Sequence, residues 1–228
     1  MIRLENVTKS YPLLGLRRHY VFRDLNLTIP SRRNVGIVGR NGAGKTTLLR
    51  MLGGVDVPDR GRVYISPDVR MSPIANATGT TPILSGRANA RFACRIHGDD
   101  PQLMRERVEF IHRFSELGDF FDVPVQFYSA GMKARLNFAI SMAFDYDCYL
   151  LDEITAAGDA TFRSKATRTF KAKRGKAGLI LVSHNLRSLQ EECEAGIYIK
   201  DGQVIWYEDI RQALLAYQAD THTSGGSD

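Results

Sequence analysis

The chain has 228 residues, of which 43% are hydrophobic, and its formal net charge is +6. This length allows one compact core, or a core with a smaller appended lobe. No run approaches the roughly 18 to 20 apolar residues that a membrane-spanning helix needs, so any membrane role is expected to come through a partner.

Three cysteines, Cys94, Cys148 and Cys193, are odd in number and widely spaced. This usage argues against a disulfide framework and against a zinc site, and it predicts buried or incidental thiols. The first residues begin a strand-like alternation and lack the charged and apolar regions of a secretory signal, which predicts a cytosolic protein.

Part of the positive charge is concentrated in one segment. A basic segment of this kind would suit nucleic acid or an anionic membrane surface, but a solvated helix face is the simpler interpretation. The basic residues are Arg163, Lys165, Arg168, Lys171, Lys173, Arg174 and Lys176.

The first thirty residues predict an antiparallel β unit. Apolar and polar residues alternate over residues 2–4 and again over 25–29, and Pro30 closes the second run. The segment between them, residues 11–20, is interpreted as a basic loop.

A strand, loop and helix unit follows. Residues 35–38 predict a short buried strand, and after a glycine-rich turn residues 45–52 predict a helix. A further strand is expected over residues 62–65. Residues 67–82, rich in Pro, Thr, Ser, Ala and Gly, are interpreted as a linker into a subdomain.

Three helical stretches are predicted over residues 86–144, which form the candidate helical lobe. Strands resume at residues 148–151 and 179–182 with the basic helix between them, the alternation expected of a parallel α/β core. Residues 197–207 predict a hairpin. The expected organisation is a single domain, 1–220, with a core at 1–80 and 146–220, a helical subdomain at about 83–145, and a disordered tail at 221–228.

Residues 39–46, Gly-Arg-Asn-Gly-Ala-Gly-Lys-Thr, fit the phosphate-binding pattern G-x-x-x-x-G-K-[ST] between a strand and a helix. The glycines let backbone N–H groups turn toward phosphates, and the helix N-terminus adds positive potential. Lys45 is expected to reach the β- and γ-phosphates of ATP, and Thr46 to offer its hydroxyl to Mg²⁺. The predicted nucleotide contacts are Gly39, Asn41, Gly42, Ala43, Gly44, Lys45, Thr46 and Thr47.

Residues 149–151 predict an apolar strand that ends in Asp152 and Glu153. In a Walker B arrangement Asp152 holds Mg²⁺ through its coordination shell, and Glu153 polarises the attacking water. Alone, such a pair would be an ordinary helix cap or surface pair. The phosphate loop upstream favours the catalytic interpretation.

Residues 128–132, Tyr-Ser-Ala-Gly-Met, directly precede a predicted helix. The start of this helix would present Ser129, Ala130 and Gly131 to an anion, because its first backbone N–H groups have no partner within the helix. The alternative is a simple serine-capped helix.

These motifs, in this order, resemble the ATP-binding subunits of ABC transporters, and residues 128–132 are similar to their signature motif, L-S-G-G-Q. The resemblance implies a P-loop NTPase fold of the ABC type, an α/β core with an N-terminal antiparallel β unit and an inserted α-helical subdomain. It also implies a homodimer, in which Ser129, Ala130 and Gly131 of one subunit close over the γ-phosphate on the other subunit's phosphate loop.

Three further positions follow from the same resemblance. Asp159 resembles the aspartate of the D-loop, and His184 resembles the switch histidine that contacts the γ-phosphate, although a lone histidine after a strand is more often a cap or a packed side chain. Tyr11 resembles the aromatic residue that stacks on adenine, with Tyr20 as the alternative. The catalytic set implied is Glu153, His184 and Asp159.

One stretch departs from the family pattern. The family usually places a glutamine, or in some polysaccharide exporters a histidine, at the entrance to the helical lobe, where this chain has Gly79-Thr80-Thr81-Pro82. Thr81 or a neighbour is expected to replace it. A threonine hydroxyl is shorter than a glutamine amide, so it reaches Mg²⁺ or the lytic water only through an extra water or a backbone shift.

Several stretches are similar to the exporters of capsular polysaccharide, of the polysialic acid or group 2 capsule type: residues 39–45, 84–89, 128–132 and 155–160. This resemblance covers nearly the whole chain and implies an ATPase for export of a lipid-linked capsular polysaccharide. The implied partners are two copies of a multi-span permease at the cytoplasmic face of the inner membrane, and envelope-spanning export proteins.

Two alternatives stay open. In the first, the exported glycan would be O-antigen, teichoic acid or another lipid-linked glycan. Exporters that recognise O-antigen chain ends often add a C-terminal carbohydrate-binding domain, and we expect none here after Tyr217. In the second, the chain would be a soluble ABC ATPase acting on DNA or the ribosome, which only the basic helix supports. We expect no nucleic acid partner.

Overall fold

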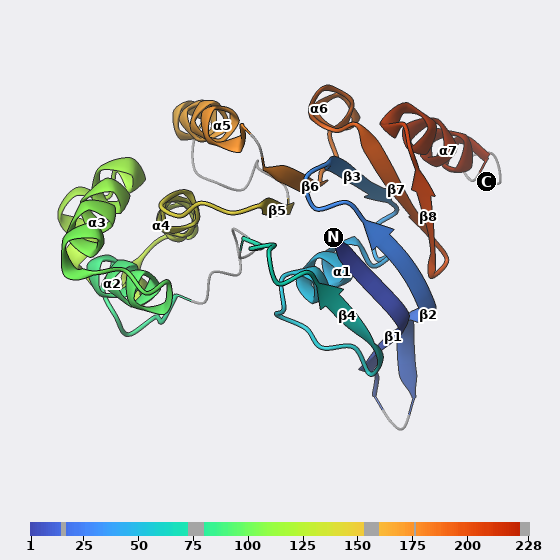
Figure 1. Cartoon of the computed structure of the whole chain (residues 1–228), viewed down its shortest axis with the longest axis horizontal. Coiled ribbons are helices and arrows are strands. Elements are labelled where there is room, and N and C mark those ends of the chain that lie inside the picture. The colour runs from blue at the N-terminus through green and yellow to red at the C-terminus, as the bar shows by residue number, and fades with distance from the viewer. Residues whose placement is uncertain (15–16, 73–79, 153–159, 176, 224–228) are drawn as a thin grey trace. The chain divides into compact units, whose positions relative to one another are not determined.

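A computed structural model of the whole chain describes residues 1–14, 17–72, 80–152, 160–175 and 177–223. The chain divides into two compact units (Figure 1). The core unit comprises Met1–Ser72, Tyr146–Glu153 and Lys176–Asp228. The helical unit comprises Pro73–Asp145 and Ile154–Gly175. The helical unit is therefore inserted into the sequence of the core unit.

An antiparallel sheet in the order β2-β1-β4 forms from β1 (Ile2–Pro12), β2 (Arg18–Ile29) and β4 (Arg60–Ile65). Ile2 pairs with both Ile29 and Ile65, and these pairs fix the register of the sheet. The predicted β unit is confirmed, and β4 adds a third strand to it.

The predicted basic loop over residues 11–20 is wrong. β1 continues to Pro12 and β2 starts at Arg18, because Tyr11 pairs with His19 and Pro12 with Arg18. Cross-strand pairing thus extends a ladder that local composition does not reveal. Figure 1 shows the long hairpin that results.

A second sheet has the strand order β5-β6-β3-β7-β8. Its first four strands are parallel and β8 is antiparallel, which confirms the predicted α/β core and the hairpin at residues 197–207. The strands are β5 (Cys148–Asp152), β6 (Gly178–Val182), β3 (Asn34–Gly39), β7 (Ala195–Lys200) and β8 (Gln203–Tyr207).

The core unit also holds the helices α1 (Lys45–Leu52), α6 (Leu186–Glu192) and α7 (Ile210–Thr223). α1 has the bounds that the sequence predicts. α7 continues through residues 221–223, which the sequence assigns to the tail, and the remainder of the predicted tail lies outside the described residues.

The helical unit contains the three helices predicted between residues 86 and 144, and two short 3₁₀ helices. Side chains of Ser85, Asp100 and Ser129 accept backbone hydrogen bonds at the starts of α2, α3 and α4, which explains where each helix begins. The elements are α2 (Gly86–Ile96), α3 (Pro101–Ser115), η1 (Gly118–Asp122), η2 (Val125–Phe127), α4 (Ala130–Met142) and α5 (Ala160–Arg174).

The basic helix α5 groups with the helical unit. The Phe162 ring lies 5.8 Å from the ring of Phe114, and the Lys165 ammonium donates to the Phe114 carbonyl at 3.0 Å and to Glu116 at 2.5 Å. Lys165 is thus packed against the unit, whereas Arg168 and Lys171 are exposed, as the solvated-face interpretation expects. The side chains of Arg163, Lys173, Arg174 and Lys176 lie outside the described residues.

All three cysteines are buried thiols, as predicted. Burial raises the pKa of Cys94 and of Cys148 to about 12, so both stay neutral thiols.

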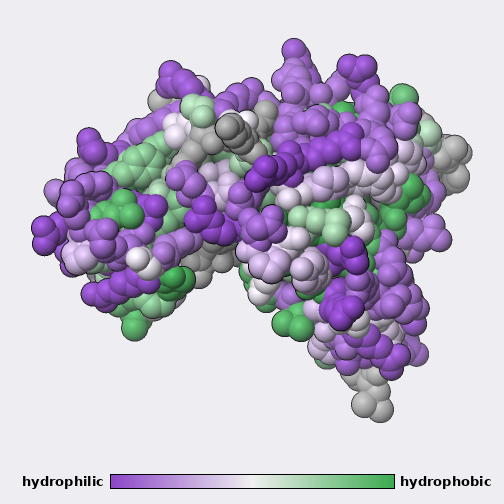
Figure 2. Space-filling model, viewed as in Figure 1, coloured by the Kyte–Doolittle hydropathy of each residue, from purple (hydrophilic) through white to green (hydrophobic). Residues whose placement is uncertain are grey.

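Among the described residues, no helix combines the length and apolar character that crossing a bilayer requires. The surface over β1, β2 and β4 is mainly hydrophilic (Figure 2).

Candidate functional site

The phosphate loop, residues 39–46, joins the carboxyl end of β3 to the start of α1. Gly42 and Gly44 adopt φ of 80° and 106°, the left-handed region that glycine tolerates without strain. A Cβ on Gly44 would come within 2.5 Å of the Val21 side chain, and one on Gly39 within 2.5 Å of the Ile199 carbonyl oxygen. Glycine is therefore required both for the turn and for the close packing of the loop.

The side chain of Lys45 points back into the phosphate loop. Its ammonium donates to the carbonyl oxygens of Gly39 at 2.7 Å and Arg40 at 2.9 Å, and the residue is only 8% exposed. These bonds hold the positive charge within the curve of the loop, where backbone N–H groups and the N-terminus of α1 also favour an anion. The geometry suits the phosphates of a nucleotide.

Three parallel strands bring the predicted residues to one edge of the sheet. Asp152 at the end of β5 pairs with Val182 of β6, and Val182 pairs with Ile37 of β3. The carboxyl ends of the three strands therefore lie within two residues of each other, and the residues that follow them meet at this edge. Asp152, the turn that carries His184, and the phosphate loop are thus neighbours.

A hydroxyl and a carboxylate face each other at this edge. The Thr46 hydroxyl donates to a carboxylate oxygen of Asp152 at 3.1 Å. Hydroxyl and carboxylate oxygens are ligands that Mg²⁺ prefers, and Mg²⁺ usually keeps several waters and phosphate oxygens in its shell. Within the described part of the chain no three His, Cys, Asp or Glu side chains gather as a metal site. The pair therefore fits a Mg²⁺ that is shared with a nucleotide.

His184 lies in the turn between β6 and α6, and its side chain is exposed. The cap of α6 is supplied by Asn185, whose side chain accepts from the Ser188 backbone N–H at 3.2 Å. The Ser183 hydroxyl in turn accepts from the Asn185 N–H at 3.1 Å. His184 is thus neither a helix cap nor a packed side chain, which leaves its imidazole available for a ligand.

Glu153 and Asp159, the other two predicted catalytic residues, lie outside the described residues. Glu153 directly follows Asp152 in sequence. Their roles stay predictions.

Tyr11 reaches the first turn of α1. Its hydroxyl donates to Asp56 at 2.7 Å and lies 3.5 Å from the Thr47 hydroxyl, and the Lys9 ammonium lies 5.1 Å from the centre of its ring. Burial, followed by the bond to Asp56, raises the pKa of Tyr11 despite its contact with Thr47. The sequence gives no local sign of Asp56, which follows α1 and orients the tyrosine.

Tyr20, the alternative, stacks on another cation. The Arg23 guanidinium carbon lies 3.6 Å from the centre of the Tyr20 ring. The two tyrosines therefore have different neighbours: Tyr11 is next to Thr47, a predicted nucleotide contact, whereas Tyr20 is part of the wall of a separate cavity.

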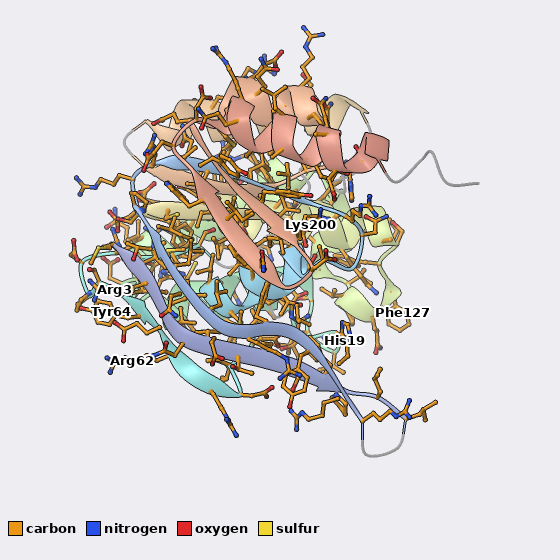
Figure 3. The ribbon with its side chains drawn as sticks, turned by 90° about the vertical axis from the view of Figure 1, so that its right-hand side faces the viewer. Arg3, His19, Arg62, Tyr64, Phe127 and Lys200 are labelled. Carbon is orange, nitrogen blue, oxygen red and sulfur yellow. The ribbon has the colours of Figure 1, made fainter. Side chains whose placement is uncertain are left out.

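That cavity has a volume of about 750 Å³ and adjoins the phosphate loop. Its walls come from β2, from the loop itself and from the β7–β8 turn, and they carry the cations Arg23, Arg40 and Lys200. Figure 3 labels His19 on β2 and Lys200 beside the β7–β8 turn, both of which line it. A cavity of this size is in the range of small-molecule sites.

The predicted signature lies in the helical unit. Ser129 is exposed, and its hydroxyl oxygen accepts from the Met132 N–H at 3.2 Å, so the serine-cap alternative is part of the structure. A hydroxyl that accepts a cap bond still has its own proton to donate. The N–H groups of Ala130 and Gly131 lie in the first turn of α4, where the helix supplies no partner. The cap and an anion contact are therefore compatible.

The turn that contains Thr81 is fixed by a buried asparagine. Thr81 N–H donates to the Asn89 side chain at 2.7 Å, and the Asn89 amide donates to the carbonyls of Thr81, Leu84 and Ser85. Asn89 is only 3% exposed. Sequence reasoning did not assign it this role, although a polar residue on the buried face of α2 is a usable signal. Gly79 lies outside the described residues.

Comparison with known proteins places these features among ATP-binding proteins. The family described as ABC transporter matches residues 22–156. The chain is 44% identical over 219 residues to the polysialic acid transport ATP-binding protein KpsT of Escherichia coli, covering 96% of each chain. It is 37% identical to the ATP-binding protein BexA of Haemophilus influenzae, covering 95% of this chain and 98% of BexA.

A solved structure is also similar. The dimeric, post-hydrolysis structure of the ATP-binding cassette MJ0796 bound to ADP and Pi matches with a TM-score of 0.76 and 25% identity. The match covers 92% of this chain and 99% of that one. The ABC-type fold that the sequence predicts is therefore confirmed.

Proposed function

Because the chain belongs to the ABC transporter family and is an ATP-binding ATPase, we propose that it drives the export of a lipid-linked capsular polysaccharide across the cytoplasmic membrane. The observation that carries this proposal is the near full-length similarity to KpsT, a polysialic acid transport ATP-binding protein. The ATP-binding protein BexA supports the ATP-binding part of this assignment over a comparable length.

The chemistry at the sheet edge is hydrolysis of the terminal phosphate of ATP. Lys45 holds the β- and γ-phosphates, and the backbone N–H groups of residues 41–46 bind their oxygens. Thr46 and Asp152 would hold Mg²⁺, which supplies positive charge to the phosphates when bound. Glu153 accepts a proton from the attacking water, and His184 donates a hydrogen bond to the γ-phosphate.

The second half of each site comes from another copy of the chain. Ser129, Ala130 and Gly131 of one copy contact the γ-phosphate on the phosphate loop of its partner, so two ATP molecules join a homodimer. The dimeric cassette MJ0796 supports this arrangement. ATP binding then closes the dimer, and hydrolysis reopens it.

The helical unit offers apolar surface for a membrane partner. Phe92 and Ile96 of α2, and Phe127 of η2, are exposed although they are large and hydrophobic, and Figure 2 shows hydrophobic side chains at the surface of this unit. Phe92 and Ile96 lie one helical turn apart on the same face of α2, and exposed apolar side chains that share a face favour contact with another protein. Two copies of a multi-span permease would hold the dimer at the cytoplasmic face of the inner membrane, together with envelope-spanning export proteins.

Gene replacement in the source organism tests this function. The gene is deleted and complemented with the wild-type chain or with Lys45→Ala, which removes the ammonium from the phosphate loop. We expect the wild type to restore surface glycan, and Lys45→Ala to leave lipid-linked capsular polysaccharide inside the cell. Normal surface glycan in the deletion strain would contradict the proposal, and intracellular accumulation of O-antigen or teichoic acid would reassign the cargo.

A further inference from the structure

Asp220, near the end of α7, gathers three polar side chains from elsewhere in the core unit. Its carboxylate accepts from the Tyr198 hydroxyl at 2.8 Å, forms an ion pair with Lys200, and lies 3.7 Å from the Arg40 guanidinium. The Asp220 backbone carbonyl also accepts from Arg40 at 2.9 Å. Arg40 therefore contacts both the side chain and the backbone of one residue.

Asp220 and Tyr198 each have one protonation state at neutral pH. Hydrogen bonds from Lys200 and Tyr198, and the nearby Arg40, lower the pKa of Asp220, so it is a carboxylate. Burial and the bond to Asp220 raise the pKa of Tyr198 to about 12, so the phenol stays a neutral donor. The Asp220 side chain is 16% exposed, whereas that of Arg40 is 49% exposed.

The helix that carries Asp220 is seated closely on the parallel sheet. A Cβ on Gly196 of β7 would meet the Ala213 side chain at 2.4 Å, and one on Gly36 of β3 would meet Ile210 at 2.8 Å. Both Ile210 and Ala213 are buried. The close approach leaves α7 little freedom to shift, so Asp220 is a fixed point relative to β3 and β7.

Arg40 connects this fixed point to the phosphate loop. Its side chain contacts Asp220, and its backbone carbonyl accepts from the Lys45 ammonium at 2.9 Å. On the other side of the loop, Gly39 lies against the backbone of β7 at Ile199. Gly39 and Arg40, the first two residues of the loop, are thus held by β7 and α7. Neither of these elements contains another residue of the predicted nucleotide site.

We propose that Asp220 is a positioning residue for ATP binding, which acts through Arg40 to keep the phosphate loop in the conformation that holds Lys45. The C-terminal helix therefore sets nucleotide affinity without contacting the nucleotide. This inference rests on ATP being the ligand of the phosphate loop.

A positioning role for Asp220 and a purely electrostatic effect predict opposite changes in KM for ATP when the Asp220 carboxylate is removed. Asp220 is an anion close to an anion-binding loop, so its removal would strengthen ATP binding if charge alone mattered, and salt would screen the effect. If Asp220 positions Arg40, its removal loosens the loop and weakens ATP binding. The direction of the change in KM therefore separates the two.

The test uses the full chain and measures kcat and KM for ATP, together with thermal melting. Asp220→Asn removes the charge that pairs with the Arg40 guanidinium but keeps the backbone carbonyl that Arg40 also contacts. It is expected to raise KM about two- to fivefold, the loss of one partly exposed ion pair, with kcat within about twofold of wild type. Asp220→Glu should restore part of the affinity. Arg40→Gln, which removes the guanidinium from both contacts, should raise KM at least as much, and adding Asp220→Asn to it should raise KM no further.

Tyr198→Phe is the matched control, because it removes another partner of Asp220 without touching the loop, and its KM should equal that of the wild type. An unchanged or lowered KM in both Asp220→Asn and Arg40→Gln would overturn the inference, as would a lower melting temperature with no change in KM. A wild-type chain without ATPase activity would instead contradict the proposed function. If Asp220→Asn does not fold, Arg40→Gln tests the same contact from the exposed side.

Discussion

The Thr46 hydroxyl lies 3.1 Å from a carboxylate oxygen of Asp152, although 106 positions separate the two residues in sequence. Thr46 and Asp152 lie in different secondary-structure elements, so no local structure brings them together. Thr46 is brought there by the phosphate loop after β3, and Asp152 by the end of β5, with β6 between the two strands. The parallel sheet is what converts two separate sequence motifs into one site.

Asp152→Asn is therefore expected to weaken the binding of Mg²⁺. Loss of the carboxylate should raise the Mg²⁺ concentration for half-maximal ATPase activity by at least about 10- to 100-fold, because even the partners of a metal's ligands have effects of this size. A Mg²⁺ titration at saturating ATP measures it. The control is Asp201→Asn in the β7–β8 turn, where a φ of 49° suits asparagine. Equal Mg²⁺ dependence in the two variants would remove Asp152 from the metal site.

Glu153→Gln is expected to separate binding from hydrolysis. The amide keeps the shape of the side chain but cannot accept a proton, so hydrolysis should fall by about two to four orders of magnitude. ATP binding should be retained, and the variant should accumulate as a closed dimer, visible by size-exclusion chromatography with light scattering. Near-normal hydrolysis would exclude Glu153 from the role of base.

Tyr11→Ala and Tyr20→Ala together decide which tyrosine stacks on adenine. Loss of a stacked ring costs about 1 to 3 kcal/mol per base, so we expect Tyr11→Ala to raise the Kd for ATP about tenfold and Tyr20→Ala to change it little. Tyr11→Phe should bind nearly as well as the wild type, since it keeps the ring and loses only the contacts of the hydroxyl with Asp56 and Thr47. A larger effect at Tyr20 would reverse the assignment.

Asp56 should make the core unit sensitive to acid. Its hydrogen bond from Arg50, and then that from Tyr11, lower its pKa below the usual value of 3.8. A carboxylate with a lowered pKa stabilises the fold above its unfolded pKa, and this contribution is lost as pH falls through the folded pKa. Asp56→Asn should therefore lower the melting temperature at pH 7, and the difference should shrink below about pH 4.

The control for this prediction is Glu191→Gln, which removes an exposed ion pair with Arg187 on α6. Such surface pairs contribute little to the free energy of unfolding. A melting temperature that falls equally in both variants, or a difference for Asp56→Asn that does not depend on pH, would contradict the role given to Asp56.

The sequence predicts those parts of the site that are made locally. The phosphate loop and α1 follow from a contiguous pattern with glycines at fixed positions, and Asp152 follows from a short apolar strand. The contact of Arg40 with Asp220 joins residues 180 positions apart and has no local pattern. Asn89 differs, because its partners lie within eight positions of it in sequence, and the signal for its role is a polar residue on the buried face of α2.

Cross-strand and helix packing account for the other differences. The extension of β1 to Pro12 depends on pairing with β2, which periodicity in either segment alone does not show. The position of α5 depends on aromatic contacts of Phe162 with Phe114 and Phe138. In its sequence α5 has the features of an ordinary crossover helix, so tertiary packing decides to which unit it belongs.

The most direct test of the transport function is co-purification of the tagged chain from gently solubilised native membranes. Mass spectrometry then identifies its stoichiometric partner and any bound glycolipid. A multi-span permease in equal copy number, together with a capsule-type lipid-linked glycan, is the predicted result. Ribosomes or DNA in place of a permease would contradict it.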